Sequence, residues 1–170
     1  MYSDFNSSMD QLAVFFKIAS KDSIDQWAIR FCQEKRDGLM DNLRKKNAIN
    51  KKQMQKEGFK PIKDGIYYKS ISKGNSKEHC TISDEITVRY TGKLMNGYVF
   101  DSNSNQPHGE TTLSLSNVIK GWQIALPYMS VGETAEFVIP YNLAYGENGT
   151  GPIPAYSNLR FTITLVRINK

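Results

Sequence analysis

The sequence contains few of the side chains that common catalytic mechanisms require. Its two histidines, His79 and His108, both stand in polar stretches typical of loops. A histidine-dependent catalytic triad would need one of these residues to be held rigidly. Neither a phosphate-binding nor a dinucleotide-binding glycine motif occurs, and the Gly-x-Ser-x-Gly turn of hydrolases is missing. The only cysteines, Cys32 and Cys80, have no histidine cluster beside them, so we expect no metal site. Since the cofactor-binding motifs are also missing, we expect no cofactor.

Asp101 is the notable carboxylate, because it stands between Phe100 and Ser102. A turn residue that accepts hydrogen bonds from backbone N–H groups would look the same in sequence, so a structural and a functional interpretation both stay open.

Large aromatic and aliphatic side chains near glycine-rich turns are abundant. Each of them can be ordinary core, but a small sheet crossed by one helix cannot bury every large ring. An apolar pocket with a few polar groups at its rim is the general form of a binding site, and Trp122 is a candidate for its floor. The side chains in question come from six segments of the chain: Tyr90, Phe100, Val118, Ile119, Trp122, Tyr145, Ile153 and Phe161.

The elements that must position these residues fall into two parts. Residues 8–57 are predicted to be helical, because their apolar residues recur at helical spacing. Residues 20–22 supply a break, and Gly38 either loosens the second helix or splits it. Gly58 is the expected end of the helical part, since glycine is common just after the last turn of a helix.

From residue 59 onward the apolar pattern changes to the alternation typical of strands. Asn96-Gly97 predicts a hairpin, and residues 117–126 predict one short helix. The fold class is therefore α+β, with a helical region 1–58 followed by a domain 59–170. We expect five or six antiparallel strands within these segments: 59–62, 66–71, 86–92, 98–100, 111–115, 134–139 and 159–168.

Charge and cysteine usage bound the partners and the compartment. The formal charge of +5 comes from residues 1–75, which carry a net +6, while residues 76–170 carry −1. The basic segment lacks interleaved aromatic residues, so a solvated helix face is favoured over a nucleic-acid surface. Two thiols in dissimilar surroundings favour a reducing, cytoplasmic location; a periplasmic or outer-membrane location is the alternative if a signal segment has been removed. No apolar run approaches the roughly 20 residues of a membrane-spanning helix.

Seven short motifs together resemble the FKBP-type peptidyl-prolyl cis-trans isomerases in order and spacing. The similarity covers residues 84–168, and residues 41–83 are similar to the lead-in of bacterial members of the macrophage infectivity potentiator type, in which a helical region precedes the isomerase domain. The motifs are Val88–Gly92, Gly97–Ser102, Val118–Trp122, Met129–Glu133, Ile139–Pro140, Ala144–Gly146 and Ile153–Pro154.

The resemblance implies a half-barrel of antiparallel sheet wrapped on a short helix, with the active site between them. It implies catalytic roles for Tyr90, Asp101, Ile119 and Tyr145. It further implies that the substrate's proline is bound by Phe100, Leu113, Val118, Trp122, Ile153 and Phe161.

Two departures from the family pattern concern the rim of this pocket. Leu113 stands where many members have an aromatic residue, and Ala155 replaces the second proline of a common Ile-Pro-Pro run. The floor residue Trp122 is retained.

Two functions follow as expectations. The first is an isomerase that accelerates rotation about X-Pro bonds in proline-containing polypeptide clients. The second is a chaperone or peptide-binding module with the same fold and little isomerase activity. Macrolide inhibitors are possible ligands of the pocket. The helical region, with Phe15, Phe16, Trp27 and Phe31 as apolar anchors, is expected either to pair with a second copy or to fold back as a cap.

Overall fold

The structure is a computed structural model, and it describes residues 21–104 and 109–169. It divides into two compact units, residues 1–45 and residues 46–170. The sequence predicted a domain boundary between residues 58 and 59. That position falls inside the second unit.

The described part of the first unit is a single long helix, α2 (Lys21–Lys46). Gly38 does not split it, because a single glycine inside a helix costs only about 1 kcal/mol relative to alanine. The rings of Trp27 and Phe31 stack along one face, with centroids 5.1 Å apart. Phe15 and Phe16 lie outside the described residues. In the described part of the chain no helix has the length and apolar character needed to span a membrane.

The expectation that the helical region continues to residue 57 is wrong near its end. Residues 47–50 leave the helix, and a new helix, α3 (Lys51–Lys56), begins after Asn50. The Asn50 side chain accepts a hydrogen bond from the Gln53 N–H at 3.2 Å, which satisfies one of the free N–H groups at the start of a helix. Gly58, at φ +83°, follows α3 as expected of a residue just after a helix.

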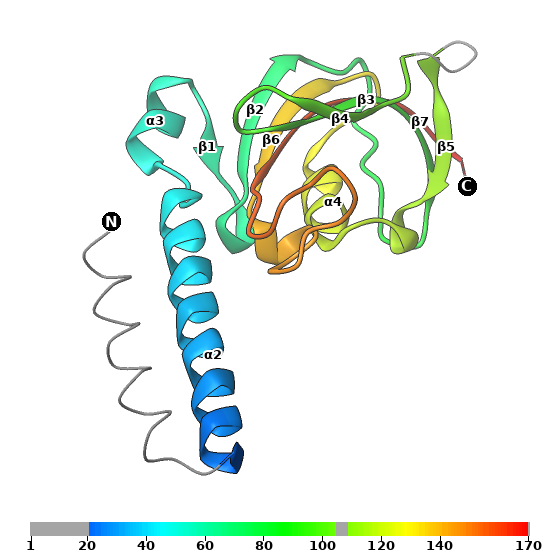
Figure 1. The fold of residues 1–170 in the computed structure, drawn as a ribbon. Coiled ribbons are helices and arrows are strands. Elements are labelled where there is room, and N and C mark those ends of the chain that lie inside the picture. Colours follow the sequence, from blue (N-terminus) through cyan, green and yellow to red (C-terminus); the bar gives the residue numbers. More distant parts are fainter. Residues whose placement is uncertain (1–20, 105–108, 170) are drawn as a thin grey trace. The chain divides into compact units, whose positions relative to one another are not determined.

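The second unit contains a seven-stranded antiparallel sheet among its described residues (Figure 1). The spatial order is β1-β2-β6-β7-β3-β4, and β5 also pairs with β3. The longest ladder joins β3 to β7. It runs from Glu85, which pairs with Asn169, to Leu94, which pairs with Leu159. The strands are β1 (Lys60–Pro61), β2 (Tyr67–Ser72), β3 (Glu85–Leu94), β4 (Val99–Ser102), β5 (Thr111–Ser114), β6 (Thr134–Ile139) and β7 (Leu159–Asn169).

Short helical turns complete this unit. The sheet curves around the short helix α4 (Lys120–Ala125), as Figure 1 shows. The expected helix over 117–126 is thus shorter, with 3₁₀ turns on both sides of it. These turns are η3 (Leu115–Asn117) and η4 (Leu126–Tyr128), and two more are η1 (Lys63–Gly65) and η5 (Tyr141–Leu143).

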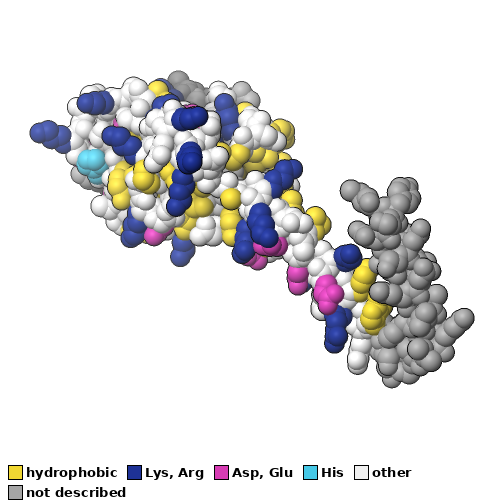
Figure 2. Space-filling view, turned by 90° about the vertical axis from the view of Figure 1, so that its left-hand side faces the viewer, with side chains coloured by type: hydrophobic (Ala, Val, Ile, Leu, Met, Phe, Trp, Pro, Cys, Tyr) yellow, Lys and Arg dark blue, Asp and Glu magenta, His cyan; other side chains and the backbone are white. Residues whose placement is uncertain are grey.

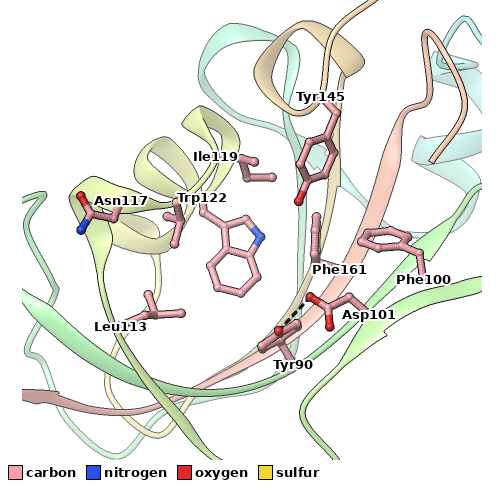
Figure 3. Close-up of a pocket in the computed structure, with 10 residues that line it drawn as sticks. Tyr90, Phe100, Asp101, Leu113, Asn117, Ile119, Trp122, Tyr145 and Phe161 are labelled. Atoms are coloured by element: carbon pink, nitrogen blue, oxygen red, sulfur yellow. Dashed lines mark hydrogen bonds between the residues drawn. The ribbon is translucent and has the colours of Figure 1, made fainter. Parts of the chain in front are cut away.

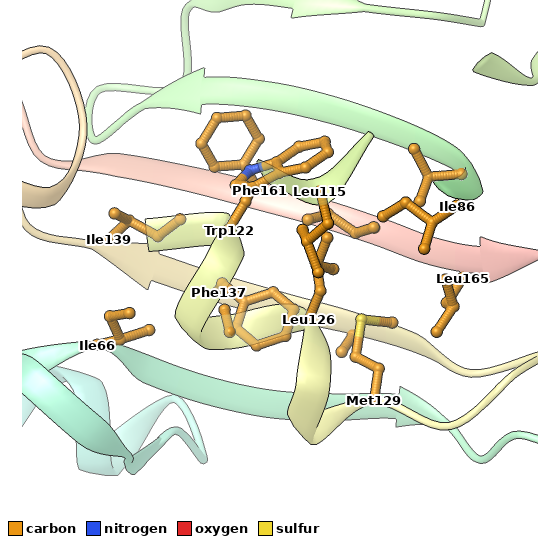
Figure 4. Packing of buried hydrophobic residues seen from close by; sticks show 14 of the residues in the cluster. Ile66, Ile86, Leu115, Trp122, Leu126, Met129, Phe137, Ile139, Phe161 and Leu165 are labelled. Carbon is orange, nitrogen blue, oxygen red and sulfur yellow. The ribbon is translucent and has the colours of Figure 1, made fainter. Parts of the chain in front are cut away.

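The core lies between α4 and the concave face of the sheet (Figure 4). Trp122 and Leu126, from α4 and the turn after it, pack against Phe137, Ile139 and Phe161 of β6 and β7. Alternation explains this arrangement, because in β7 every second residue from Leu159 to Leu165 is buried. The α+β class and the half-barrel on a short helix are confirmed.

A second, smaller apolar cluster anchors α3 to the other side of the sheet. Met54 and Phe59 are buried against Tyr67 and Val138. The Arg160 guanidinium donates to the Glu57 carboxylate at 2.5 Å and lies 5.3 Å from the centroid of the Phe59 ring. Residues 51–59 therefore belong to the fold of the second unit.

Candidate functional site

A pocket of about 330 Å³ opens between α4 and the sheet (Figure 3). It brings together nine of the ten residues expected to form the site, and these come from β3, β4, β5, the start of α4, the segment after η5, and β7. It adds one residue that the sequence did not indicate, Asn117. The full lining is Tyr90, Phe100, Asp101, Leu113, Asn117, Val118, Ile119, Trp122, Tyr145 and Phe161.

Trp122 forms the floor of the pocket. Its side chain is 4% exposed, and the rings of Tyr90 and Phe161 meet it edge to face with centroids at 5.3 and 5.2 Å. Phe100 meets Phe161 in the same way at 5.6 Å. Edge-to-face rings hold each other's orientation, so these four form a stable apolar wall. Among the described residues, the indole Nε1–H of Trp122 is the buried side-chain polar atom without a hydrogen bond.

Two glycines allow the rings and the helix to come this close. A Cβ on Gly92 of β3 would stand 2.7 Å from the Phe100 ring and 2.8 Å from the Phe161 ring. A Cβ on Gly121 of α4 would stand 2.3 Å from Cγ2 of Ile139. A side chain at either position would push a pocket wall or the floor helix outward.

The start of α4 presents the backbone of Val118 and Ile119 to the pocket. Gln123 holds this turn, because its side-chain amide donates to the carbonyl oxygens of Val118 at 2.8 Å and Ser116 at 3.1 Å. The Ile119 carbonyl accepts from the Trp122 N–H at 3.0 Å. Within the described part of the chain, no protein acceptor takes up the Ile119 N–H, which is therefore available to a ligand.

The polar side of the pocket consists of two tyrosines and one carboxylate. The Tyr90 hydroxyl donates to Oδ2 of Asp101 at 2.9 Å, drawn as a dashed line in Figure 3. Burial, and then the Asp101 carboxylate, raise the pKa of Tyr90 to about 12. Burial, and again Asp101, raise the pKa of Tyr145, whose hydroxyl points into the pocket. Both phenols are therefore neutral donors at physiological pH, and the carboxylate is an acceptor.

One expected residue does not line the pocket. Ile153 is 5% exposed and belongs to the main core cluster. Its backbone pairs with that of Thr150 through two hydrogen bonds, of 2.8 and 2.9 Å, which fix the turn in which it stands. Asn117 was missed because a single exposed amide at the end of η3 carries no sequence signal.

His79 takes no part in this site. The His79 Nδ1 lies 3.1 Å from the Pro127 carbonyl oxygen, in an exposed position away from the lining, and His108 lies outside the described residues. Over the described residues, no three His, Cys, Asp or Glu side chains gather as metal ligands would. What the pocket offers is an apolar cavity with a few fixed donors and acceptors.

Comparison with known proteins gives a consistent family. The FKBP-type peptidyl-prolyl cis-trans isomerase domain matches residues 76–166. The peptidyl-prolyl cis-trans isomerase Mip of Coxiella burnetii is 39% identical over 132 residues, which is 76% of this chain and 56% of that protein. The crystal structure of FkpA from Escherichia coli covers 95% of this chain and 82% of that one, with a TM-score of 0.63 and 27% identity.

The comparison also corrects the expected location. Outer membrane protein MIP of Legionella longbeachae is 37% identical over 131 residues, covering 76% of this chain and 55% of that protein. The cytoplasmic prediction is wrong in the light of this relative. It rested on Cys32, which is exposed, and Cys80, which is buried, and a domain with a core of this size needs no disulfide in any compartment.

The chain spans little more than half the length of the Coxiella and Legionella relatives. The family match over residues 76–166 includes all the residues that line the pocket. The resemblance noted in the sequence motifs is confirmed, including its similarity to the macrophage infectivity potentiator type. This chain belongs to the FKBP-type peptidyl-prolyl cis-trans isomerase family.

Proposed function

We propose that this chain accelerates cis–trans rotation about X-Pro bonds in polypeptide clients. The observation that carries the proposal is the pocket itself: an apolar cavity floored by Trp122, with the Tyr145 hydroxyl and the Ile119 N–H free to meet a peptide. Its volume of about 330 Å³ suits a proline ring and its neighbouring peptide groups.

The chemistry that such a pocket must perform breaks no covalent bond. The barrier to rotation, about 18–20 kcal/mol, is the loss of amide resonance in the twisted state. A catalyst needs only to bind the twisted amide more tightly than either planar form. The twisted amide is less dipolar than the planar one, so an apolar cavity that excludes water favours it. Each tenfold acceleration requires about 1.4 kcal/mol of such differential binding.

We infer the following roles from the positions of the side chains. Trp122 supports the pyrrolidine ring, and Val118, Phe100 and Phe161 enclose it. The Ile119 N–H and the Tyr145 hydroxyl donate to substrate carbonyl oxygens. Asp101 orients the Tyr90 hydroxyl, which lies 2.9 Å from it, and faces the carbonyl that rotates.

Exchange spectroscopy on an X-Pro peptide tests this function. We expect the full chain to raise the cis–trans exchange rate, Trp122→Leu to remove most of the gain, and Asp101→Ala to reduce it by about tenfold, the loss of one charge-assisted interaction. Tyr98→Phe, at an exposed ring on the hairpin, is the matched control and is expected to retain the wild-type rate. Exchange at the uncatalysed rate with wild-type protein would end the enzyme proposal.

The alternative is a client-binding module whose pocket holds proline without accelerating its rotation. Suppression of aggregation during refolding of a client distinguishes the two. If Trp122→Leu loses isomerisation but suppresses aggregation as well as wild type, client binding is a separate activity. If Trp122→Leu loses both isomerisation and the suppression of aggregation, the pocket serves both activities.

The same pocket is the proposed site for macrolide inhibitors. Leu113 provides a smaller wall than an aromatic ring would, so we expect weaker macrolide binding than in members with an aromatic residue there. Titration calorimetry of wild type and Leu113→Phe measures this, with tighter binding expected for the variant.

We further propose that α2 pairs with a second copy of the chain. The support is that Trp27 and Phe31 stack on one face of α2, which gives this helix an apolar stripe of the kind that packs against another helix. Sedimentation of the full chain is expected to give a dimer mass, reduced to that of a monomer in Phe31→Glu. Ile29→Glu, two residues away and therefore on the other side of the helix, is the matched control. A monomer mass for the wild type contradicts the proposal.

A nucleic-acid partner receives no support. On the face shown in Figure 2, Lys and Arg side chains are spread over the second unit and alternate with uncharged and apolar surface. A nucleic-acid groove gathers its basic side chains along one path.

A further inference from the structure

Two buried asparagines bind the backbone of the segments that carry the two tyrosines of the pocket. Asn103 is 3% exposed and Asn158 is 4% exposed, and neither lines the cavity. A buried side-chain amide is costly unless its donors and acceptor are paired, and a paired amide fixes the groups around it. Their hydrogen bonds therefore indicate what each one holds in place.

Asn103 fills a gap in the edge of the sheet. β5 pairs with β3 from Glu85 to Val88, and β4 pairs with it from Thr91 to Lys93, so the backbone of β3 between them has no strand on that side. The Asn103 side chain substitutes for one, because its Oδ1 accepts from the Tyr90 N–H at 2.8 Å and its Nδ2 donates to the Val88 carbonyl at 2.8 Å.

Further bonds of Asn103 hold Tyr90 and the entry to β5. The Asn103 backbone N–H donates to the Tyr90 carbonyl at 3.3 Å, and Nδ2 also reaches the Thr111 hydroxyl at 3.2 Å. One residue thus holds the backbone of Tyr90 at both its N–H and its carbonyl. Asn103 also follows Asp101 by two residues in the chain. Its bonds to the Tyr90 backbone therefore hold Tyr90 next to the segment that carries Asp101.

Asn158 performs a similar task for the segment that carries Tyr145. Its Oδ1 accepts from the Tyr141 N–H at 2.9 Å, and its Nδ2 donates to the Asn47 carbonyl. The Tyr141 carbonyl in turn accepts from the N–H groups of Ala144 at 3.0 Å and Gly146 at 2.8 Å. The backbone is therefore held immediately before and after Tyr145, and the chain of contacts begins at Asn158.

We propose that Asn103 and Asn158 are positioning residues, the first for Tyr90 and Asp101 and the second for Tyr145. The effects on reaction rate that this proposal predicts rest on the proposed isomerase function. Asn158 also makes the segment directly after α2 part of the support of the pocket, since Asn47 lies within the second unit.

Crossed double-mutant cycles on kcat/KM test the assignment. We expect Asn103→Ala and Asn158→Ala each to lower kcat/KM by about tenfold, the order of loss that slight misplacement of a reacting group produces. In a Tyr145→Phe background, Asn158→Ala should lose most of its effect, while Asn103→Ala should retain it. In a Tyr90→Phe background, Asn103→Ala should lose most of its effect, while Asn158→Ala should retain it. Sites that do not share a partner multiply in their effects, so the crossed pairs serve as internal controls.

A general loss of stability gives a different result. It lowers the unfolding temperature but leaves all four combinations multiplicative. Thr87→Val provides a matched comparison, because Thr87 is a buried polar residue of β3 whose hydroxyl forms hydrogen bonds with Thr112 and Asn169 and with neither tyrosine. It is expected to leave kcat/KM unchanged in every background. Asn103→Ser and Asn158→Ser replace the alanine variants if either of those does not fold.

The NMR signals of the tyrosine rings decide the proposal independently of activity. With the rings assigned through the Tyr90→Phe and Tyr145→Phe variants, replacing Asn103 should shift the Tyr90 signals and leave those of Tyr145 in place. Replacing Asn158 should do the opposite. Equal shifts of both rings in both variants overturn the proposal, as do multiplicative cycles throughout. If wild type shows no isomerase activity, the function fails, and the ring signals still decide the positioning.

Discussion

The side chains of the pocket work as neutral donors and one carboxylate acceptor, with no nucleophile among them. Tyr90 and Asp101 share a hydrogen bond of 2.9 Å, and Tyr145 stands across the cavity with its hydroxyl directed inward. An enzyme that only has to favour a twisted amide needs donors in fixed places and an environment without water. Tyrosine supplies both, because its ring packs like an apolar residue while its hydroxyl remains polar.

The raised pKa of Tyr90 predicts an alkaline loss of stability. In the folded chain this pKa is about 12, raised first by burial and then by Asp101, whereas its ordinary value is 10.0. The folded state therefore keeps a proton that the unfolded state releases between pH 10 and 12, and stability must fall as pH rises through that window. Chemical denaturation at intervals from pH 8 to 12 should show this fall. In Tyr90→Phe the fall should be smaller, because the titrating hydroxyl is gone.

Tyr98→Phe controls for the general effect of removing one phenol. The Tyr98 ring is 55% exposed at the tip of the β3–β4 hairpin, so its variant should follow the wild-type curve. A Tyr90→Phe curve that coincides with that of Tyr98→Phe contradicts the prediction.

At this scale the sequence indicated residues of the candidate site where a motif fixed both the residue type and its place on a strand or helix. Tyr90 and Asp101 on strands and Trp122 on α4 are of this kind. Ile153 and Asn117 show what a motif leaves undetermined. Both stand in irregular segments, where the direction of a side chain depends on turn geometry and on tertiary contacts rather than on periodicity.

At the scale of elements, the distance between α4 and the sheet defines the pocket floor. Gly121 lies against Ile139, which is fully buried, and a methyl group there would meet Cγ2 at 2.3 Å. Gly38 offers the contrasting case, a helical glycine with nothing within 4 Å of the place that a methyl group would occupy. The same substitution should therefore have opposite effects at the two sites.

We expect Gly121→Ala to lower the free energy of unfolding by about 1–3 kcal/mol, the usual cost of overpacking. Gly38→Ala should instead stabilise α2 by up to about 1 kcal/mol, since alanine is the better helix former. Thermal unfolding followed by circular dichroism measures both. As a check on the cause, Ile139→Ala should cost less in the Gly121→Ala background than in wild type. Equal costs there would show that the two residues do not compete for space.

The elements themselves were predictable where periodicity is strong. β6 spans Thr134–Ile139 as the alternation indicated, and the Asn96-Gly97 hairpin joins β3 to β4 with Gly97 at φ +92°. The end of α2 at Lys46 was not predicted, because no glycine or proline between Gly38 and Gly58 marks it. The division of one edge of β3 between β4 and β5 depends on a single buried amide, that of Asn103, and such long-range pairing has no local signal.

At the scale of the whole molecule, the basic surplus of the sequence lies largely outside the pocket. Of the ten residues that line the cavity, only Asp101 belongs to the charged residue types Asp, Glu, Lys and Arg. Two basic side chains lie instead on the outer side of the sheet, where Lys69 of the lead-in and Arg160 of β7 stand over the Phe59 ring. Hydrogen bonds from Gln53 and then Arg160 hold the pKa of Glu57 below its ordinary value, so this carboxylate stays charged in the pair.

This arrangement predicts that the isomerase domain begins before residue 59. Met54 is 2% exposed and Phe59 3% exposed, both against the outer face of the sheet. A chain of residues 59–170 would lose Met54, and with it the cover over Tyr67 and Val138, whereas a chain of residues 46–170 would keep the whole cluster.

We expect 59–170 to be less stable than 46–170 by about 2–5 kcal/mol, the range found when a buried large side chain is removed from a core. Urea denaturation of the two fragments measures the difference. Met54→Ala in the full chain isolates the apolar part and should cost about 2–3 kcal/mol, because the cluster is small and can partly collapse. Lys52→Ala, at an exposed position of the same helix, is the matched control and should cost less than about 0.5 kcal/mol. Since no pocket residue precedes Tyr90, both fragments should accelerate X-Pro exchange at temperatures where they are folded. If the two fragments unfold at the same urea concentration, the α3 segment contributes nothing to the domain, and the boundary at residue 59 stands.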